Sequence, residues 1–328
     1  MTMIQQVVFE LETDYLGHPY YITGHALYNA LARRVEPALR RTLQVSHGIF
    51  APCEYGQYPD SHSWSGGGYM GKTLRPVERY DDLFVYRDPA QRWLLDGRPR
   101  EAHNTHALHS HGGRLAIAPR CRFGRPPASR NYKRTVTWYV HCYLHTAGNA
   151  DAHLPLAEET LAGLRVGGSR NYGFGELSVA DTQCIDLDEL DYGRLDDADD
   201  YVLELVAPYV LSSAYPNADD QPIPWWWDPI DERPGQDLRR RDEQLVDDGD
   251  VYPLETVDHG QVVEYAGDEP VQTAKNGVLR VGTHSRYGYG EFRLRPADDD
   301  RVSERDGGLT QWAPAQRATQ TQTQEGIR

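Results

Sequence analysis

Cysteine is scarce in this chain, which has only four in 328 residues. They stand at positions 53, 121, 142 and 184, with no C-x-x-C pair and no zinc-ribbon spacing, so we expect buried free thiols. Long apolar runs are missing too, since no stretch of 18 apolar residues occurs. The N-terminus, MTMIQQVVFELETDYLG, lacks the basic and apolar regions of a signal peptide. These absences predict a soluble, cytoplasmic protein with no membrane partner.

Positive charge is also in short supply. Asp and Glu outnumber Lys and Arg by 49 to 34, and the formal net charge is -15. This balance is unexpected for a nucleic-acid-binding protein, which usually carries a basic footprint. However, Asp-rich runs such as 186–200 and the preference for Arg over Lys fit a salt-rich cytoplasm, where charges are screened over about 3 Å at 1 M salt. We therefore interpret the acidity as halophilic adaptation and look to local basic patches for a ligand.

Glycine, in contrast, is concentrated in two matching segments. LRVGGSRNYGFGEL (164–177), the first glycine loop, aligns without gaps on LRVGTHSRYGYGEF (279–292), the second glycine loop. Eight of the fourteen aligned residues are identical, including a Tyr-Gly-aromatic-Gly-Glu core. Self-similarity of this kind indicates that the chain contains two copies of one kind of domain.

The pattern around the first glycine loop predicts the type of domain. Residues 4–12 and 134–146 alternate like strands, whereas 23–35 and 155–164 have helical spacing or helix-start signals. With the loop and the strand that follows it, these elements give most of the β-α-β-β-α-β order of a ferredoxin-like domain. The second half begins with a predicted strand at 201–213, but its helices are poorly marked.

The predicted fold is therefore α+β, with two tandem ferredoxin-like (RRM-like) domains, each ending in a glycine loop and a strand. We place the first domain at 1–182, with a long insertion at about 48–133. An acidic linker at 183–200 leads to the second domain at 201–297. The remaining residues, 298–328, lack apolar periodicity and are predicted to be a disordered tail.

The glycine loops combine features that suit single-stranded RNA. Glycine permits positive φ and close backbone approach, N–H groups and arginine forks can hold phosphate, and aromatic rings can stack on bases. The alternative is a tight turn with its aromatics in the core, but two copies that both carry arginine favour ligand contact. The predicted RNA-binding residues are Arg165, Gly167, Gly168, Ser169, Arg170, Tyr172, Gly173, Phe174 and Gly175 in the first loop, and Arg280, Gly282, His284, Arg286, Tyr287, Gly288, Tyr289 and Gly290 in the second.

Neither loop has the G-x-G-x-x-G or G-K-[ST] pattern of a nucleotide-binding loop, and we expect no cofactor. The segment RCRFGRPPASRNYKR (120–134) has six bases and no acids, which indicates an RNA-backbone contact or a thumb-like loop. Its candidate residues are Arg122, Arg125, Arg130 and Lys133.

The histidines of HNTHALHSH are weak metal candidates, because their spacing matches no known zinc motif and favours a solvated loop. They are His103, His106, His109 and His111.

The tryptophans of WWWD (225–228) have three interpretations that the sequence leaves open: a surface on which RNA stacks, a docking site for a neighbouring subunit, or packing between the two domains.

The succession of helix, LRVGGSRNYGFGEL and strand resembles the glycine-rich loop of the RAMP superfamily of CRISPR-associated proteins, RNA-binding subunits built from ferredoxin-like domains. ITGHALYNALARR (22–34) and LELVAPYVLSS (203–213) are also similar to that superfamily, and the resemblance covers about half of the chain. It implies a non-catalytic subunit that holds CRISPR or other guide RNA beside further effector subunits. Tandem loops look most like the subunits that cap the 5′ handle of the guide. The acidity and the His- and Gly-rich insertion depart from familiar members and indicate a divergent, haloarchaeal-type variant.

A second branch of the same superfamily cleaves precursor RNA without a metal, with a histidine near the first helix as general acid or base. His25 and His47 are the candidates here, because an imidazole titrates near pH 7 and can exchange a proton with a 2′-OH or a leaving oxygen. Each also fits a helix-start or core histidine. Endoribonuclease activity is therefore the alternative to RNA binding without cleavage.

Overall fold

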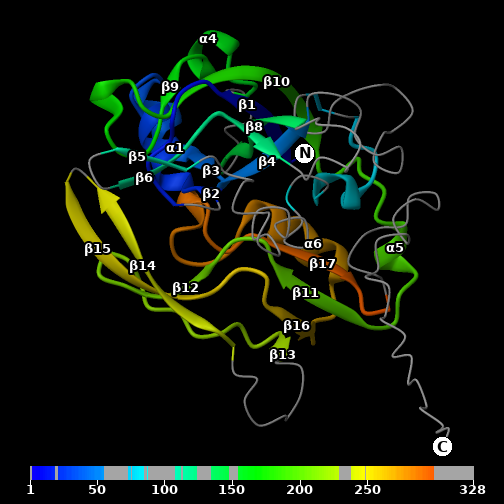
Figure 1. Ribbon diagram of the computed structural model, residues 1–328. Coiled ribbons are helices and arrows are strands. Elements are labelled where there is room, and N and C mark those ends of the chain that lie inside the picture. Colours follow the sequence, from blue (N-terminus) through cyan, green and yellow to red (C-terminus); the bar gives the residue numbers. More distant parts are fainter. Residues whose placement is uncertain are drawn as a thin grey trace, which may run out of the picture.

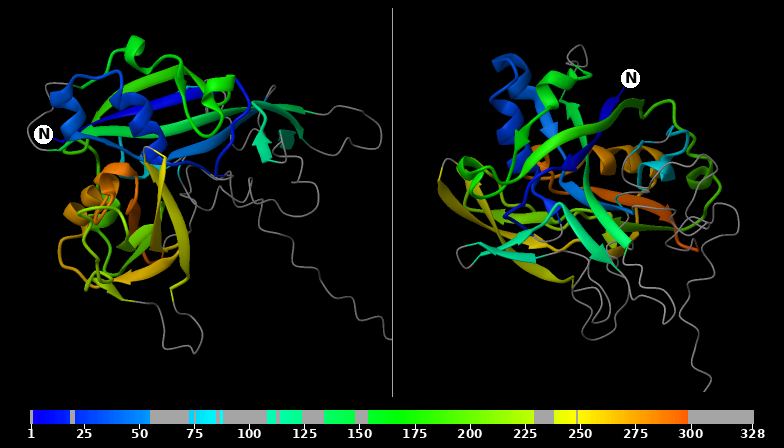
Figure 2. Two further views of the ribbon diagram at one scale, coloured as in Figure 1. Left: turned by 90° about the vertical axis from the view of Figure 1, so that its left-hand side faces the viewer. Right: turned by 45° about the horizontal axis from the view of Figure 1, so that its top comes forward.

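The computed structural model describes residues 2–18, 21–54, 73–74, 76–84, 87, 108–111, 114–123, 134–147, 154–228, 238–247 and 249–298. These residues form a mixed α+β structure whose strands pair antiparallel. In Figure 1 and in the left view of Figure 2, most elements of the first half lie above those of the second half. No helix of the described part is long and apolar enough to cross a lipid bilayer.

The first half is built on a sheet with the core order β4-β8-β1-β10. These strands are β1 (Met3–Leu11), β4 (Gly48–Glu54), β8 (Arg134–Thr146) and β10 (Glu176–Asp186). Helix α1 (Gly24–Ala32) lies between β1 and β4 in the chain, and α4 (Glu158–Leu161) lies between β8 and β10. The described elements therefore follow the β-α-β-β-α-β order expected from the sequence.

Short elements extend this sheet and its connections. Strands β2 (Tyr21–Ile22) and β9 (Leu164–Arg165) flank it, and β3 (Leu43–Val45) and β7 (Arg120–Phe123) pair with β8. Helix α2 (Pro37–Thr42) follows α1, η1 is a single 3-10 turn at Tyr80–Phe84, and β5 (Leu108–His111) pairs with β6 (Arg114–Ile117).

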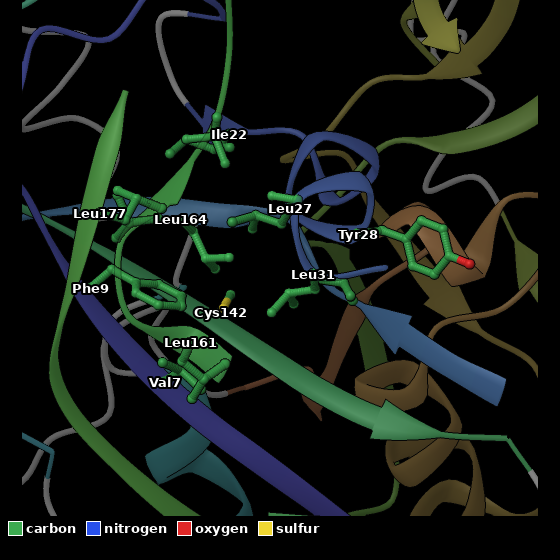
Figure 3. Packing of buried hydrophobic residues seen from close by; sticks show 14 of the residues in the cluster. Val7, Phe9, Ile22, Leu27, Tyr28, Leu31, Cys142, Leu161, Leu164 and Leu177 are labelled. Carbon is green, nitrogen blue, oxygen red and sulfur yellow. The ribbon is translucent and has the colours of Figure 1, made fainter. Parts of the chain in front are cut away.

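The first core forms between the sheet and the helices. The predicted helix start is confirmed, because the Thr23 side chain accepts a hydrogen bond from the N–H of Ala26. The inward-facing side chains of α1, α4 and β1 meet there, as Figure 3 shows for Leu27, Leu31, Leu161, Val7 and Phe9. Packing of this apolar stripe against the alternating face of β1 fixes α1 on the sheet.

The second half contains part of the same arrangement of strands and helices. Its main sheet has the order β13-β16-β11-β17, and helix α6 (Pro270–Leu279) precedes β17. The strands are β11 (Tyr201–Leu205), β13 (Trp227–Asp228), β16 (Val262–Tyr265) and β17 (Phe292–Pro296). The described residues between β11 and β13 contain no helix, so a second complete ferredoxin-like domain stays a prediction.

A second, three-stranded sheet begins where that helix would stand in the chain, since its first strand lies between β11 and β13 and its other two strands follow β13. It has the order β12-β15-β14, from β12 (Tyr209–Ser213), β14 (Arg240–Asp247) and β15 (Asp250–Val257). The single strand expected at 201–213 is thus two strands in two sheets. The chain turns at Val206–Pro208, where the N–H groups of Val206 and Ala207 both donate to the carbonyl of Glu291 and the carbonyl of Pro208 accepts from Gly290.

The segments expected to be connections have more structure than the sequence indicates. Residues 48–54, which we assigned to the insertion, form β4 in the first sheet, and 120–123 form β7. The proline and cysteine in GIFAPCE hide this strand from a pattern search. The acidic segment 183–200 contains the end of β10 and α5 (Gly193–Asp196), and its apolar side chains enter the second core. The tail from residue 299 lies outside the described residues.

Candidate nucleic-acid interface

The two glycine loops have the same backbone conformation around their central turns. Each contains one 3-10 turn, η5 (Arg170–Tyr172) in the first and η6 (Ser285–Tyr287) in the second. A left-handed residue precedes each turn, Ser169 with φ 57° and His284 with φ 64°, and a left-handed glycine follows it. The repeat found in the sequence is therefore also a repeat of backbone structure.

The last glycine of each loop is required by a close backbone approach. A Cβ atom on Gly175 would lie 1.9 Å from the carbonyl oxygen of Val166, and a Cβ atom on Gly290 would lie 1.9 Å from that of Val281. Both glycines have positive φ. Their carbonyl groups accept hydrogen bonds from Val166 and Val281 at 3.0 and 3.1 Å. Each loop is therefore a rigidly closed turn before its strand.

The first glycine loop is open to solvent. The Tyr172 side chain is 85% exposed, and Arg170 is half-buried beside it. Arg165 forms a surface ion pair with Glu176 at 3.2 Å. The N–H groups of Gly168 and Gly175 donate to the carbonyls of Leu16 and Asp14, so they hold the loop in place and do not point to a ligand. What this loop offers a ligand is its tyrosine and arginine side chains.

The second glycine loop, in contrast, is packed against the first half. A Cβ atom on Gly288 would lie 2.2 Å from Nδ1 of His47, and one on Gly24 would lie 2.3 Å from the carbonyl oxygen of Tyr287. Tyr289 is 1% exposed. Its hydroxyl donates to Glu243, which also accepts from Tyr21 of β2 at 2.8 Å. In this arrangement the first half covers much of the loop.

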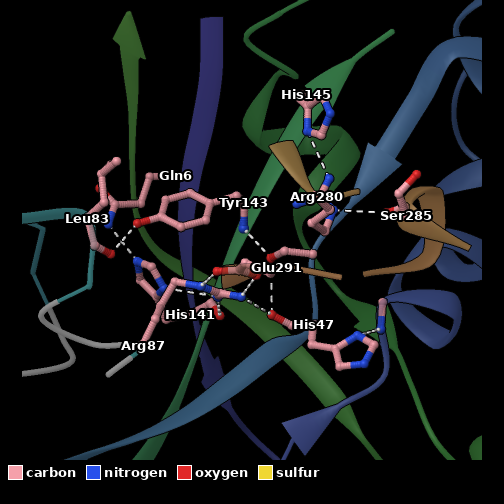
Figure 4. Close-up of polar contacts among 12 residues, drawn as sticks. Gln6, His47, Leu83, Arg87, His141, Tyr143, His145, Arg280, Ser285 and Glu291 are labelled. Atoms are coloured by element: carbon pink, nitrogen blue, oxygen red, sulfur yellow. Dashed lines mark hydrogen bonds and ion pairs between the residues drawn. The ribbon is translucent and has the colours of Figure 1, made fainter. Parts of the chain in front are cut away.

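Arg280 and the glutamate of the second loop join a buried polar network (Figure 4). The Arg280 guanidinium donates to Nδ1 of His145 and to the carbonyl of Ser285. Glu291 accepts two hydrogen bonds from Arg87 at 2.6 and 2.5 Å, and both side chains are fully buried. Burial lowers the pKa of Arg87, but the charge and hydrogen bonds of Glu291 more than offset this and raise it. The corresponding first-loop glutamate, Glu176, forms only a surface pair.

The two histidines considered for catalysis lie at this interface between the halves. His47 is fully buried, accepts a hydrogen bond from the N–H of Gly24 at 2.9 Å, and stacks on Tyr21. His25 is 5% exposed, and its Nε2 lies 3.5 Å from a carboxylate oxygen of Asp247 at the end of β14. The local sequence does not reveal this partner, because it comes from a hairpin more than two hundred positions away.

A third histidine, His284 of the second loop, lies close to His25. Both imidazoles contact the ring of Tyr287, and Nε2 of His284 lies 2.7 Å from Oγ of Ser213. Burial, and then the charge of His25, lower the pKa of His284 to about 4. His284 is therefore neutral at pH 7. Sequence reasoning placed His284 among the RNA contacts and gave no role to Ser213 or Asp247.

The remaining candidates fall largely outside the described residues. These are His103, His106, Arg125, Arg130 and Lys133, and the side chains of Arg122, His109 and His111. The described residues contain no group of His, Cys, Asp or Glu side chains that could hold a metal ion. Of the tryptophans, Trp226 and Trp227 pack against aromatic side chains of the second half, whereas Trp225 is 79% exposed.

Comparison with known proteins adds only distant similarity. No protein-family model matches this chain, and no curated protein sequence matches it either. A solved structure described as "CRISPR associated protein Cas6" is similar, with a TM-score of 0.38 and 9% sequence identity. That match covers 91% of this chain and 100% of the other. The function proposed below therefore rests on the residues of this chain.

Proposed function

We propose that this protein binds single-stranded RNA through its first glycine loop. One observation carries the proposal: Tyr172 and Arg170 stand on a rigidly closed turn, Tyr172 is 85% exposed, and Arg170 has no ion pair in the described part of the chain. An exposed ring beside a guanidinium group can stack on a base and hold the neighbouring phosphate. A tyrosine this exposed contributes little to folding, so its ring is available to stack on a ligand.

The RNA that we propose is a guide, and the role is structural. The first glycine loop with its flanking helix and strand resembles the RNA-gripping loop of RAMP proteins, which supports a CRISPR or related guide RNA as ligand. The finer assignment to a subunit that caps the 5′ handle, with other effector subunits as partners, is part of this proposal. The burial of His47 and His25 favours binding over cleavage, because a catalytic imidazole must reach the RNA.

Affinity purification of the tagged chain from a high-salt host tests this proposal. We expect short RNAs with a uniform 5′ end to co-purify, together with other RNA-binding proteins. Arg170→Ala combined with Tyr172→Ala should reduce the amount of RNA, and Glu176→Gln on the same loop is the control that should not. Wild-type protein that carries no RNA and binds none when it is added would contradict the proposal.

Metal-independent RNA cleavage is a second candidate, favoured by the arrangement of His25 and His284. One imidazole is paired with the Asp247 carboxylate, the other with the Ser213 hydroxyl, and both face Tyr287. Because His284 is neutral at pH 7, it would be the base in attack by a 2′-OH, and His25 would be the acid. Incubation with a labelled repeat RNA in EDTA tests this. Cleavage that disappears in His25→Ala while RNA binding persists would establish the nuclease, and intact RNA with the wild-type protein would exclude it.

A further inference from the structure

Four exposed arginines surround the short connection between α1 and α2. The segment LARRVEPALRRT (31–42) contains Arg33, Arg34, Arg40 and Arg41, with Glu36 as its only acid. All four arginines are exposed. Leu39 of α2 belongs to the same core as α1, so the connection is fixed against the first sheet. In a chain with a net charge of -15, this is a strongly basic local surface.

These arginines differ from most others in the described residues because they lack carboxylate partners. Arg79, Arg87, Arg120, Arg165, Arg194, Arg239, Arg240, Arg241, Arg293 and Arg295 each form an ion pair. Within the described ranges, no ion pair involves Arg33, Arg34, Arg40, Arg41, Arg170 or Arg286. Acidic side chains are in excess, so a shortage of carboxylates does not explain the difference.

Two contacts link the α1–α2 connection to the segments that carry the two glycine loops. The Arg34 guanidinium donates to the carbonyl of Gly163 at 2.7 Å, directly before the first glycine loop that carries Arg170. On the other side, the guanidinium of Arg286 lies 4.5 Å above the ring of Tyr28 and donates to the Arg40 carbonyl. We call these six residues the arginine track; it extends from the first glycine loop, across the α1–α2 connection, to the second.

Helix electrostatics explains only part of this arrangement. Arg40 and Arg41 stand in the last turn of α2, where the helix macrodipole favours bases. That effect acts within one helix, and it does not account for Arg170 and Arg286, which come from the two glycine loops. Six like charges on one surface repel one another and attract a polyanion.

We infer that the arginine track binds the phosphate backbone of single-stranded RNA, leading it from the first glycine loop across the α1–α2 connection to Arg286. This inference rests on the proposed function and specifies the path of the RNA. Guanidinium groups suit the role because their planar forks hold phosphate oxygens bidentately. The track contacts phosphates and not base edges, so its contribution is independent of RNA sequence and sensitive to salt.

Binding of labelled oligouridine to the full chain, measured by fluorescence anisotropy over a series of KCl concentrations, tests the inference. The variant is Arg40→Gln with Arg41→Gln. The control, which has the same change in net charge, is Arg239→Gln with Arg240→Gln at the start of β14. The track variant should bind roughly tenfold more weakly. Its slope of log K against log salt should be shallower by about 1.4, because two phosphate contacts are lost. The control should keep the wild-type slope.

The outcomes separate this inference from the proposed function. If the track variant keeps the wild-type affinity and slope while Tyr172→Ala loses affinity, the inference that the arginine track binds RNA is wrong, and the proposed function stands. If the wild-type chain does not bind oligouridine or repeat RNA, both are overturned. If the track variant melts early, Arg33→Gln with Arg41→Gln replaces it, since both side chains are exposed and neither forms a hydrogen bond or an ion pair within the described residues. That variant must show the same loss of affinity and slope.

Discussion

Replacing Tyr172 with alanine should weaken RNA binding and leave folding stability unchanged. The side chain is 85% exposed and has no aromatic contact in the described part of the chain, so its removal should change the free energy of unfolding by less than about 0.5 kcal/mol. A base stacked on an aromatic side chain contributes about 1–3 kcal/mol to binding. The dissociation constant should therefore rise roughly 5- to 150-fold.

The equivalent residue of the second loop, Tyr287, provides the matched comparison. Its ring contacts those of His25 and Tyr28 at centroid distances of 4.8 and 5.3 Å across the interface between the halves. Loss of these pairs and of the buried area should lower the free energy of unfolding by about 2–4 kcal/mol. Both variants are measured by thermal melting and by RNA anisotropy at one salt concentration. Wild-type RNA affinity in Tyr172→Ala, or unchanged melting of Tyr287→Ala, would refute this division of roles.

Three further predictions concern the buried part of the second loop. Glu291→Gln removes one charge of a fully buried ion pair and should destabilise the fold by about 3–5 kcal/mol in denaturant titration, whereas Glu176→Gln at the surface should change stability by less than about 0.5 kcal/mol. Gly290→Ala should destabilise more than Gly163→Ala, since a Cβ atom has open space at Gly163 but meets a carbonyl 1.9 Å away at Gly290; equal melting temperatures would contradict the close approach. Burial and a neighbouring histidine hold the pKa of His284 at about 4 against its usual 6.5. As the pH falls, the unfolded chain binds a proton at this histidine before the folded chain does. The free energy of unfolding should therefore decline as the pH falls from 6.5 to about 4. In His284→Asn the melting temperature should depend less on pH in this range. A pH profile of melting identical to that of the wild type would contradict this assignment to His284.

The sequence predicts those features that depend on local spacing. The glycine pattern specifies a turn because each glycine has a fixed backbone role, and the amphipathic stripe of α1 specifies a buried face. The roles of the two loops differ because of packing between distant segments. Tyr172 and Tyr287 occupy the same position in matching loops. Tyr172 is exposed, whereas the ring of Tyr287 packs against Tyr28 of the other half. Contacts such as His25 with Asp247 depend on how the halves pack, and no local pattern encodes them.

The candidate RNA surface was therefore only partly predictable. The arginines of the first glycine loop stand out beside its glycines, and they remain candidates. Arg33, Arg34, Arg40 and Arg41 follow an ordinary helix pattern. That they have no carboxylate partner among the described residues becomes visible only when the ion pairs of the folded chain are known. Strand β4 was missed because GIFAPCE, with its proline, lacks a clear strand pattern, and because its pairing with β8 is long-range.

Ultraviolet cross-linking of the wild-type protein to single-stranded RNA, with the attached peptides identified by mass spectrometry, tests the central claim most directly. An exposed aromatic ring that stacks on a base is well placed to form a cross-link. We predict cross-links at Tyr172 in the first glycine loop, and their loss in Tyr172→Ala without loss of folding. Cross-links confined to other surfaces, such as the β14–β15 hairpin, or the absence of any cross-link, would contradict the proposal that the first glycine loop holds RNA.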